Sequence, residues 1–332
     1  MSEAATLTKK DFVSDQEVRW CPGCGDYAIL NGVQQVFASL GVPKEQFVLI
    51  SGIGCSSRFP YYLDTYGFHT IHGRAPALAS GVKIANPDLD VWVVTGDGDG
   101  LSIGGNHLIH AMRRNLNLKV LLFNNRIYGL TKGQYSPTSE PGKKTPSTPF
   151  GSLDEPFNPI AVALGAGSTF VARTVDTRLP HLKSVLEAAH AHKGFAFVEI
   201  LQNCVIFNDG AFDHIAGREV RDDRLVDLRP GEQLTFGKEA NKGLRFTPDS
   251  IEVVASEDAD TWDSSRPAGA RAFRICQGSE HEDLPVPVGI FRAVERPVLE
   301  DMIHEQIGQA TESLGEGSLE SLLAAGETWQ VD

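Results

Sequence analysis

Two acidic side chains stand between glycines in the stretch "TGDGDGLSIGG", which follows the apolar run "VWVV". The dinucleotide-binding pattern G-x-G-x-x-G, begun at Gly96, would require glycine where the sequence has Leu101. Glycine weakens regular structure and neighbouring carboxylates repel each other, so this combination needs a chemical reason. The pattern therefore indicates that Asp97 and Asp99 belong to a site at the end of a strand.

A second source of oxygen ligands follows at the end of the next predicted strand, in "LLFNNRIYGLT". Asn125 comes far enough after Asp97 for a loop, a helix and a strand that returns parallel to the first. Ligands of parallel sheets bind beyond the carboxyl ends of the strands, and Mg²⁺ commonly bridges carboxylates to phosphate oxygens. Each motif alone is also ordinary turn chemistry. Together they favour a site for Mg²⁺ and a diphosphate.

Five cysteines form the third candidate group. Cys21 and Cys24 make a C-P-G-C turn, whereas Cys55 and Cys204 are far apart in the sequence and Cys276 lies near the C-terminus. An odd number of cysteines without a secretion signal favours metal binding or catalysis over a disulfide framework. A four-cysteine zinc site and a 4Fe-4S cluster both remain possible, although zinc sites usually pair two C-x-x-C units.

The elements that must position these residues follow an α/β rhythm. Apolar runs alternate with helical stretches, which predicts one mostly parallel sheet with helices on both faces. The expected strands are "QFVLISG", "DVWVVTG", "KVLLFNN", "TFVART" and "FAFVEI". The expected helices are residues 26–39, 75–86, 103–115, 158–165 and 178–192.

Two segments depart from that rhythm. Residues 132–159 are rich in Pro, Gly, Ser and Thr and are too long for an ordinary connection, so we expect a linker or a working part of a site. Beyond about Arg221 the alternation stops. We therefore predict a cofactor-binding domain over residues 1–220, and a C-terminal extension over 221–332 that packs on the core or on a partner subunit. An amphipathic segment lies near 296–314.

Composition limits the classes of partner. The chain has 332 residues, 41% of them apolar, with 30 basic and 43 acidic residues for a net charge of -13. This balance argues against nucleic acid or an anionic membrane as the main partner. The N-terminal segment carries no signal-like apolar run, and no stretch of apolar residues is long enough to span a membrane. We expect a cytoplasmic protein.

The chain resembles a known family of thiamine diphosphate enzymes. The spacing of G-D-G and N-N resembles their metal-diphosphate motif, and the whole set resembles the beta subunit of 2-oxoacid:ferredoxin oxidoreductases, of the 2-oxoglutarate type. The resemblance covers roughly residues 17–215. It is carried by the motifs "CPGCGDYAIL", "GIGCSSR", "HGRA", "GDGDG", "GGNHLIHAMRRN" and "NNRIYGLTKGQ" and by the late Cys204.

The resemblance implies three cofactors and their ligands. Mg²⁺ would be held by Asp97, Asn125 and the main-chain carbonyl of Ile127. Thiamine diphosphate would lie near Ile53, Gly54, Cys55, Ser56, His72, Gly73, Arg74, Gly98, Asp99, Gly129 and Leu130. A 4Fe-4S cluster would be bound by Cys21, Cys24, Cys55 and Cys204. His72 is the catalytic residue that the resemblance implies. Arg58 and Lys132 stand in the predicted cofactor loops, and we expect them to act in the site because a 2-oxoacid carries a carboxylate that needs cations.

The implied reaction is the reversible oxidative decarboxylation of a 2-oxoacid with coenzyme A, which yields acyl-CoA and CO₂ and passes electrons through the cluster to ferredoxin. 2-Oxoglutarate is favoured, and pyruvate or broad-range 2-oxoacid enzymes are the alternative. The glutamate that acts on the cofactor's aminopyrimidine ring comes from the alpha subunit in this family, so we expect an alpha2beta2 assembly. Two rival interpretations are a non-redox thiamine diphosphate decarboxylase or synthase and a zinc-stabilised binding module.

Overall fold

One large sheet forms the centre of the protein. The computed structural model describes residues 7–267, 269–278, 283–329 and 331. Every pairing in the large sheet is parallel except that of β11 with β5, so the predicted mostly parallel sheet is confirmed. Its strands, in spatial order, are β2 (Tyr66–His69), β1 (Phe47–Ser51), β3 (Asp90–Gly96), β4 (Leu118–Asn124), β6 (Ala196–Leu201), β5 (Phe170–Val175), β11 (Val286–Ala293) and β7 (Leu225–Leu228).

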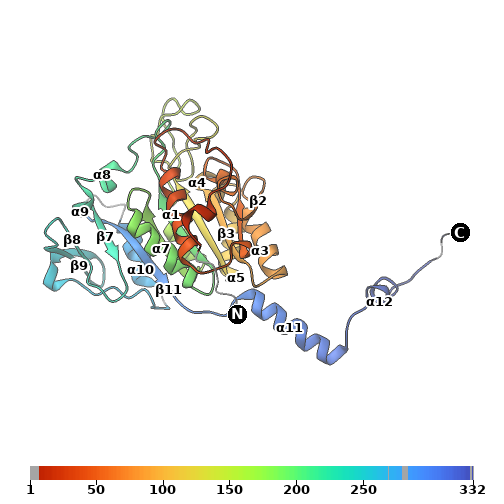
Figure 1. The fold of residues 1–332 in the computed structure, drawn as a ribbon. Coiled ribbons are helices and arrows are strands. Elements are labelled where there is room, and N and C mark those ends of the chain that lie inside the picture. Colours follow the sequence, from red (N-terminus) through yellow and green to blue (C-terminus); the bar gives the residue numbers. More distant parts are fainter. Residues whose placement is uncertain (1–6, 268, 279–282, 330, 332) are drawn as a thin grey trace.

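Helices cover both faces of this sheet and create two separate apolar cores (Figure 1). One face is covered by α1 (Asp26–Ser39) and α7 (Leu179–Ala191). The other is covered by α3 (Ala75–Ala85), α5 (Gly105–Arg114), α6 (Pro159–Gly165) and α10 (Ala270–Gln277). The three-layer arrangement matches the expectation that parallel strands are buried on both faces.

The five predicted strands and five predicted helices are all present, and α5 shows why. Leu108, Ala111 and Met112 lie on the buried face of α5, and the helix ends at Asn115, which adopts a left-handed conformation with φ of 55°. One difference concerns the acidic glycine stretch, which we expected to be a loop before a helix at about residue 103. It forms the short helix α4 (Asp97–Leu101), whose residues are all buried.

The C-terminal part contributes to the sheet as well as extending beyond it. Strands β7 and β11 continue the main sheet past β5, and a second, antiparallel sheet contains β10 (Ile251–Ala255), β9 (Lys242–Phe246) and β8 (Thr235–Phe236). The boundary at residue 220 stays a prediction. The remaining short helices are α2 (Phe59–Tyr62), α8 (Asp213–Ala216), α9 (Arg221–Arg224), α12 (Leu319–Leu323) and the 3-10 helices η1 (Lys9–Phe12), η2 (Lys44–Gln46), η3 (Ser56–Arg58) and η4 (Ser256–Asp258).

Helix α11 (Leu299–Leu314) leaves the body of the protein, and α12 lies farther out along the same arm (Figure 1). The arm is attached at its start, where the buried Glu300 carboxylate accepts a hydrogen bond from the main-chain N–H of Asn117 at 3.1 Å. Within the described residues, no helix combines the length and apolar character needed to cross a membrane.

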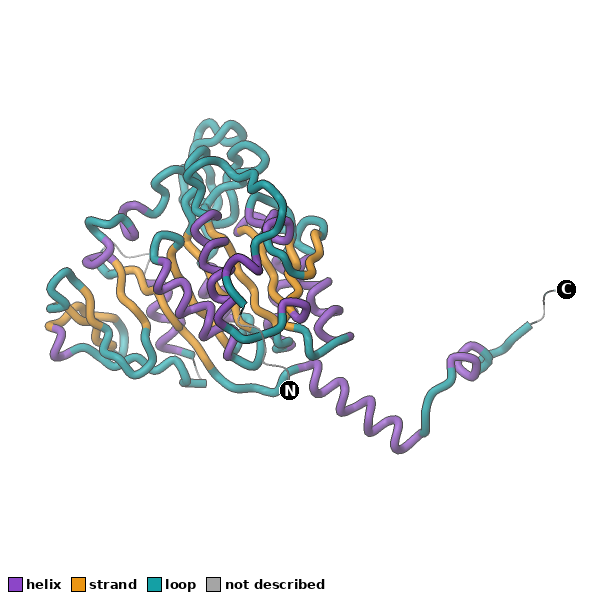
Figure 2. Tube along the Cα trace, in the orientation of Figure 1, coloured by secondary structure: helices purple, strands orange, loops and turns teal. Residues whose placement is uncertain are grey.

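The parallel strands bring their carboxyl ends to one edge, and Figure 2 shows the loops gathered at one end of the sheet. This edge receives the loops that follow β1, β2, β3, β4 and β6. It is the position at which α/β sheets bind their ligands.

Candidate functional site

The loops at this edge carry nearly all the site residues predicted from the sequence. Ile53 to Ser56 follow β1, His72 to Arg74 follow β2, Asp97 to Asp99 follow β3, Asn125 to Lys132 follow β4, and Cys204 follows β6. Cys21 and Cys24 come from the turn before α1, and Arg58 ends η3. Loops far apart in the sequence therefore meet because their strands are neighbours in the sheet.

Asp97 is a buried carboxylate held by two hydroxyl groups. Its Oδ2 atom accepts hydrogen bonds from Ser136 Oγ at 2.5 Å and from Thr138 Oγ1 at 2.6 Å. Burial raises the pKa of Asp97 above its ordinary value, and the two hydroxyl donors oppose that rise. Ser136 and Thr138 belong to the long loop after β4. The one sequence signal for these two residues is the Ser- and Thr-rich composition of that loop.

Asp99 has a different set of partners. Its Oδ1 atom accepts from the main-chain N–H of Gly73 at 2.8 Å, and its Oδ2 atom accepts from Thr95 Oγ1 at 2.7 Å. A Cβ atom at Gly52 would lie 1.8 Å from Asp99 Oδ2, so this carboxylate needs a glycine in the loop after β1. Asp99 thus ties together the loops that follow β1, β2 and β3.

The loop after β4 packs directly on the acidic glycine stretch. Tyr128 Oη donates to the carbonyl of Gly98 at 2.9 Å, and a Cβ atom at Gly98 would lie 2.2 Å from the Tyr128 ring. In the same loop Asn125 accepts from the N–H of Ile127 at 3.1 Å and donates to Gln202 at 2.8 Å. The loop with Asn125 and Ile127 is therefore fixed against the one with Asp97.

The cysteines of the predicted cluster line one cavity of about 220 Å³, together with Arg58, Asn125, Gly129, Leu130 and Lys132. A Cβ atom at Gly129 would lie 3.4 Å from Cys204 Sγ and 3.8 Å from Cys55 Sγ, so the missing side chain leaves room beside both sulfurs. Cys276 lies on the buried face of α10, away from this group. Within the described residues, no three His, Cys, Asp or Glu side chains converge on a point as ligands of one metal ion.

The thiols influence one another electrostatically. Burial raises the pKa of Cys55 to about 12, with further increases from Asp26, Cys204 and Cys21, while the Arg58 guanidinium opposes the rise. Burial also raises the pKa of Cys24, and Asp26, Cys204 and Cys55 add to it. Burial and neighbouring negative charge therefore oppose ionisation of Cys24 and Cys55, and the Arg58 guanidinium favours the Cys55 thiolate.

Three polar residues of this cavity were not anticipated from the sequence. Trp20 Nε1 donates to the carbonyl of Cys55 at 2.7 Å, and Gln202 Nε2 lies 3.3 Å from Cys24 Sγ. Asp26, in the first turn of α1, is 1% exposed, and burial raises its pKa to about 7. Its Oδ1 atom has no hydrogen-bond partner among the described residues. Each of these three residues lies within two positions of a cysteine in the sequence, and this proximity is the one signal that could have found them.

The predicted cationic residues differ in their settings. Arg58 lines the cysteine cavity and donates from Nε to Tyr62 Oη at 2.9 Å. Lys132 is exposed, with a left-handed φ of 76°. His72 is also exposed, and its carbonyl accepts from Arg74 Nη1 at 2.8 Å. Arg58 and Lys132 therefore border the same space, whereas His72 lies on the loop tied to Asp99.

The donor sets fit the cofactors that the sequence suggested. Oxygen ligands on the loops after β3 and β4 suit Mg²⁺. Gly98 lets the Tyr128 ring pack on the acidic glycine stretch, and Gly129 leaves room beside the sulfurs of Cys55 and Cys204. Four thiols around a cavity, rather than around a single point, suit an iron-sulfur cluster.

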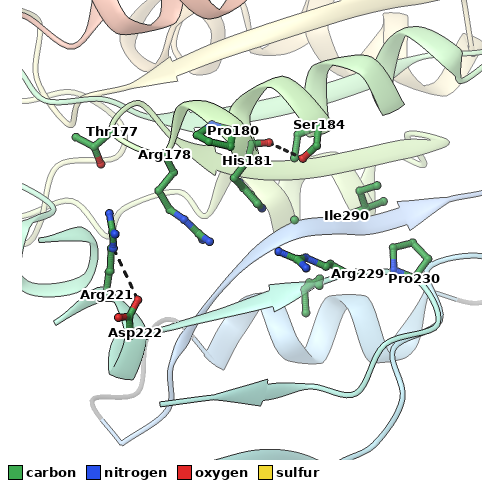
Figure 3. Close-up of a pocket in the computed structure, with 13 residues that line it drawn as sticks. Thr177, Arg178, Pro180, His181, Ser184, Arg221, Asp222, Arg229, Pro230 and Ile290 are labelled. Atoms are coloured by element: carbon green, nitrogen blue, oxygen red, sulfur yellow. Dashed lines mark hydrogen bonds and ion pairs between the residues drawn. The ribbon is translucent and has the colours of Figure 1, made fainter. Parts of the chain in front are cut away.

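A larger cavity of about 610 Å³ lies between α7, β11 and α9 (Figure 3). Arg178, Arg221 and Arg229 line it, but Arg178 forms a two-pronged ion pair with Asp227, at 2.8 and 3.0 Å, and Arg229 contacts the same carboxylate at 3.2 Å. None of the predicted site residues lines this cavity. Cavity volume alone therefore does not identify the functional site in this protein.

Comparisons with known proteins agree with this geometry. Residues 52–200 match the family described as thiamine pyrophosphate enzyme, C-terminal TPP binding domain. The chain is 54% identical to the 2-oxoglutarate oxidoreductase subunit KorB of Mycobacterium tuberculosis, over 97% of this chain and 88% of that one. It is 39% identical to the 2-oxoglutarate synthase subunit KorB of Methanocaldococcus jannaschii, over 70% of this chain and 82% of that one.

A solved structure is similar over nearly the full length. The 2-oxoglutarate:ferredoxin oxidoreductase of Magnetococcus marinus, with 2-oxoglutarate, coenzyme A and succinyl-CoA bound, matches with a TM-score of 0.75, 33% identity and 98% coverage of each chain. The fold, the motif spacing and these relatives lead to one conclusion: the chain belongs to the beta subunits of the 2-oxoacid:ferredoxin oxidoreductases.

Proposed function

We propose that this chain, with a partner subunit, catalyses the reversible oxidative decarboxylation of 2-oxoglutarate. The 2-oxoacid and coenzyme A yield succinyl-CoA and CO₂, and the two electrons released pass to ferredoxin. The observation that carries the proposal is the contact between the Asp97 and Asn125 loops beside a cavity lined by four cysteines. The bound molecules named for the Magnetococcus marinus enzyme favour 2-oxoglutarate over pyruvate.

The thiamine diphosphate site occupies the edge formed by the loops after β1 to β4. In this proposal Asp97, Asn125 and the Ile127 carbonyl hold Mg²⁺, and the main chain around Gly98 and Asp99 lies near the diphosphate. When bound, thiamine diphosphate supplies the electron sink for decarboxylation. The protein's own part is to keep the buried Asp97 carboxylate in place through Ser136 and Thr138.

The cysteine cavity holds a 4Fe-4S cluster in this proposal, with Cys21, Cys24, Cys55 and Cys204 as ligands. Cys55 belongs to the loop that follows β1 and is adjacent to Ser56, a proposed cofactor contact. The loop after β1 would therefore hold a cluster ligand next to a cofactor contact, and a bound cluster would supply one-electron transfer there. A zinc ion bound by the same four thiols is the alternative.

The 2-oxoacid approaches between the cofactor loops and the cysteine cavity. Arg58 and Lys132 border that space and supply positive charge for the substrate carboxylates. Lys132 is the residue we assign to the second carboxylate of 2-oxoglutarate. His72 precedes Gly73, whose N–H donates to Asp99, and we assign the His72 imidazole to the cofactor edge.

The partner is the alpha subunit of the same enzyme, in an alpha2beta2 assembly. Relatives named as subunits support a partner chain. We propose that coenzyme A binds largely to that partner, and that the C-terminal extension packs on a neighbouring subunit. The exposed apolar side chains of the arm, among them Leu314, Leu322 and Trp329, support this assignment.

The test begins with protein purified without air together with its partner subunit. We expect about four iron and four acid-labile sulfide per chain, and ferredoxin reduction that requires coenzyme A and is faster with 2-oxoglutarate than with pyruvate. One zinc ion and no sulfide would contradict the cluster assignment. A higher rate with pyruvate would contradict the substrate assignment while leaving the cluster intact.

A further inference from the structure

A buried ion pair crosses the middle of the main sheet. Glu199 on β6 and Arg173 on β5 lie opposite each other in register, and Arg173 Nε donates to Glu199 Oε2 at 2.6 Å. Their side chains are 1% and 5% exposed. The rest of β6 is apolar and fully buried. Because a buried ion pair is often no more stabilising than apolar side chains of the same size, its presence calls for a role other than stability.

The second oxygen of Glu199 fixes the orientation of an amide at the end of the next strand. Asn124, the last residue of β4, donates from Nδ2 to Glu199 Oε1 at 2.7 Å. Its Oδ1 atom must then point the other way, where it lies 2.9 Å from Thr138 Oγ1 and accepts from the N–H of Arg126 at 3.2 Å. Glu199 thereby sets the start of the turn that carries Asn125 and Ile127.

Thr138 connects this amide to the proposed metal ligand. Its hydroxyl lies 2.6 Å from Asp97 Oδ2 as well as 2.9 Å from Asn124 Oδ1, and one hydroxyl proton serves only one acceptor at a time. All the groups are buried: Asp97 is 1% exposed and both Asn124 and Thr138 are 3% exposed. A continuous polar chain therefore runs from Arg173 and Glu199 through Asn124 and Thr138 to Asp97.

We propose that Glu199, held by Arg173, is a positioning residue for the Mg²⁺-diphosphate site. It acts through Asn124, whose amide orientation fixes both the 125–127 turn and the Thr138 hydroxyl beside Asp97. The inference rests on the proposed function, because it presupposes that Asp97, Asn125 and Ile127 hold the metal. It assigns a role to the buried Glu199 carboxylate, which contacts Asn124 and Arg173.

The substitution Glu199→Gln tests this role in the assembled enzyme. Glutamine offers one oxygen and one NH₂ group, so it cannot accept from both Arg173 and Asn124. We expect Mg²⁺-dependent binding of thiamine diphosphate, measured by titration calorimetry, to weaken about 10- to 100-fold, as for other residues that orient metal ligands. Iron content and cluster absorbance should stay at the level of the unchanged enzyme. Unchanged affinity in Glu199→Gln would overturn the proposal.

The double variant Arg173→Met with Glu199→Leu separates positioning from stability. An apolar pair restores core packing but leaves the Asn124 amide unheld, so thermal stability should recover while the cofactor affinity stays low. Recovery of the affinity together with stability would show that the pair is only structural.

Asp97→Ala tests the metal site itself. If Asp97→Ala keeps its Mg²⁺-dependent affinity for thiamine diphosphate, the metal assignment fails and this inference fails with it. If Asp97→Ala loses that affinity and Glu199→Gln keeps it, only the role of Glu199 is refuted.

Discussion

His181 is a buried histidine that makes stability depend on pH. Its Nδ1 atom lies 2.8 Å from Thr174 Oγ1, and burial lowers the pKa of His181 to about 4, with Asp227 opposing and Arg178 and Arg229 adding to the shift. The unfolded chain binds this proton near pH 6.5 and the folded chain only near pH 4. The stabilising effect of the neutral imidazole is therefore complete above about pH 6.5 and is lost as pH falls towards 4.

We expect His181→Gln to flatten the fall in unfolding free energy between about pH 6.5 and pH 4, by at most about 3 kcal/mol. Urea unfolding at several pH values measures this slope. His192, whose pKa burial also lowers to about 4, keeps part of the dependence in the variant. The exposed His110→Gln is the matched control and should leave the slope as it is. An equal slope in His181→Gln and the unchanged protein would refute the assignment.

At single positions, the sequence predicts site residues from their side-chain types. Asp97, Asn125 and the cysteines could be predicted because carboxylate, amide and thiol groups recur at strand ends or in a C-x-x-C turn. Ser136, Thr138 and Glu199 were not found, because a hydroxyl or a single charge in an apolar strand gains meaning only from neighbours far away in the sequence. Their partners, Asp97 and Asn124, are brought to them by the order of strands in the sheet.

Helix α1 positions the C-P-G-C turn through a close approach at Gly25. The N–H of Gly25 donates to the carbonyl of Asn203 at 3.1 Å. A Cβ atom there would lie 2.0 Å from Asp176 Oδ2 and 3.1 Å from the Asn203 nitrogen. Gly25→Ala therefore pushes the start of α1, and with it Cys24, away from the ends of β5 and β6.

We expect Gly25→Ala to lower the iron and sulfide content per chain while thiamine diphosphate binding is less affected. Elemental analysis of protein purified without air, combined with titration of the cofactor, measures both. Gly81→Ala in α3 is the control, because nothing lies within 4 Å of the added Cβ, and it should be neutral or stabilising by up to about 1 kcal/mol. Full iron content in Gly25→Ala would contradict this role for α1.

Among the elements, those that bury apolar runs on both faces were predictable from the sequence, as β3 and β4 illustrate. The edge strand β2 was missed because all four of its residues are exposed and form no apolar run. Strands β7 and β11 were missed because they join the sheet from a region without an α/β rhythm. Helix α4 was missed because its two glycines oppose a helix locally. Packing against Tyr128 and Thr95 nevertheless requires residues without side chains at positions 98 and 100.

At the scale of the whole molecule, the C-terminal arm extends away from the body of the protein, and most of its side chains are exposed. Residues 299–332 contain acidic side chains but no lysine or arginine. Helix α11 carries both apolar and acidic residues, and its apolar side chains are not covered: Ile307 is 56% exposed and Leu314 is 86% exposed. A helix with such side chains in water gains little stability by itself. The acidic charge also disfavours packing of two arms against each other.

Deletion of residues 307–332 tests whether the arm serves assembly. The shortened chain keeps the anchors of α11, namely Glu300 to Asn117, Asp301 to Lys193 and His304 to the Ile84 carbonyl, so its thermal unfolding should match that of the full chain. Light scattering after co-expression with the partner subunit should show a smaller or weaker assembly, because the apolar side chains of the arm no longer contribute buried area. Gln306→Ala, an exposed polar change on the same helix, is the control. An assembly of unchanged mass and affinity would place the arm outside the subunit interface.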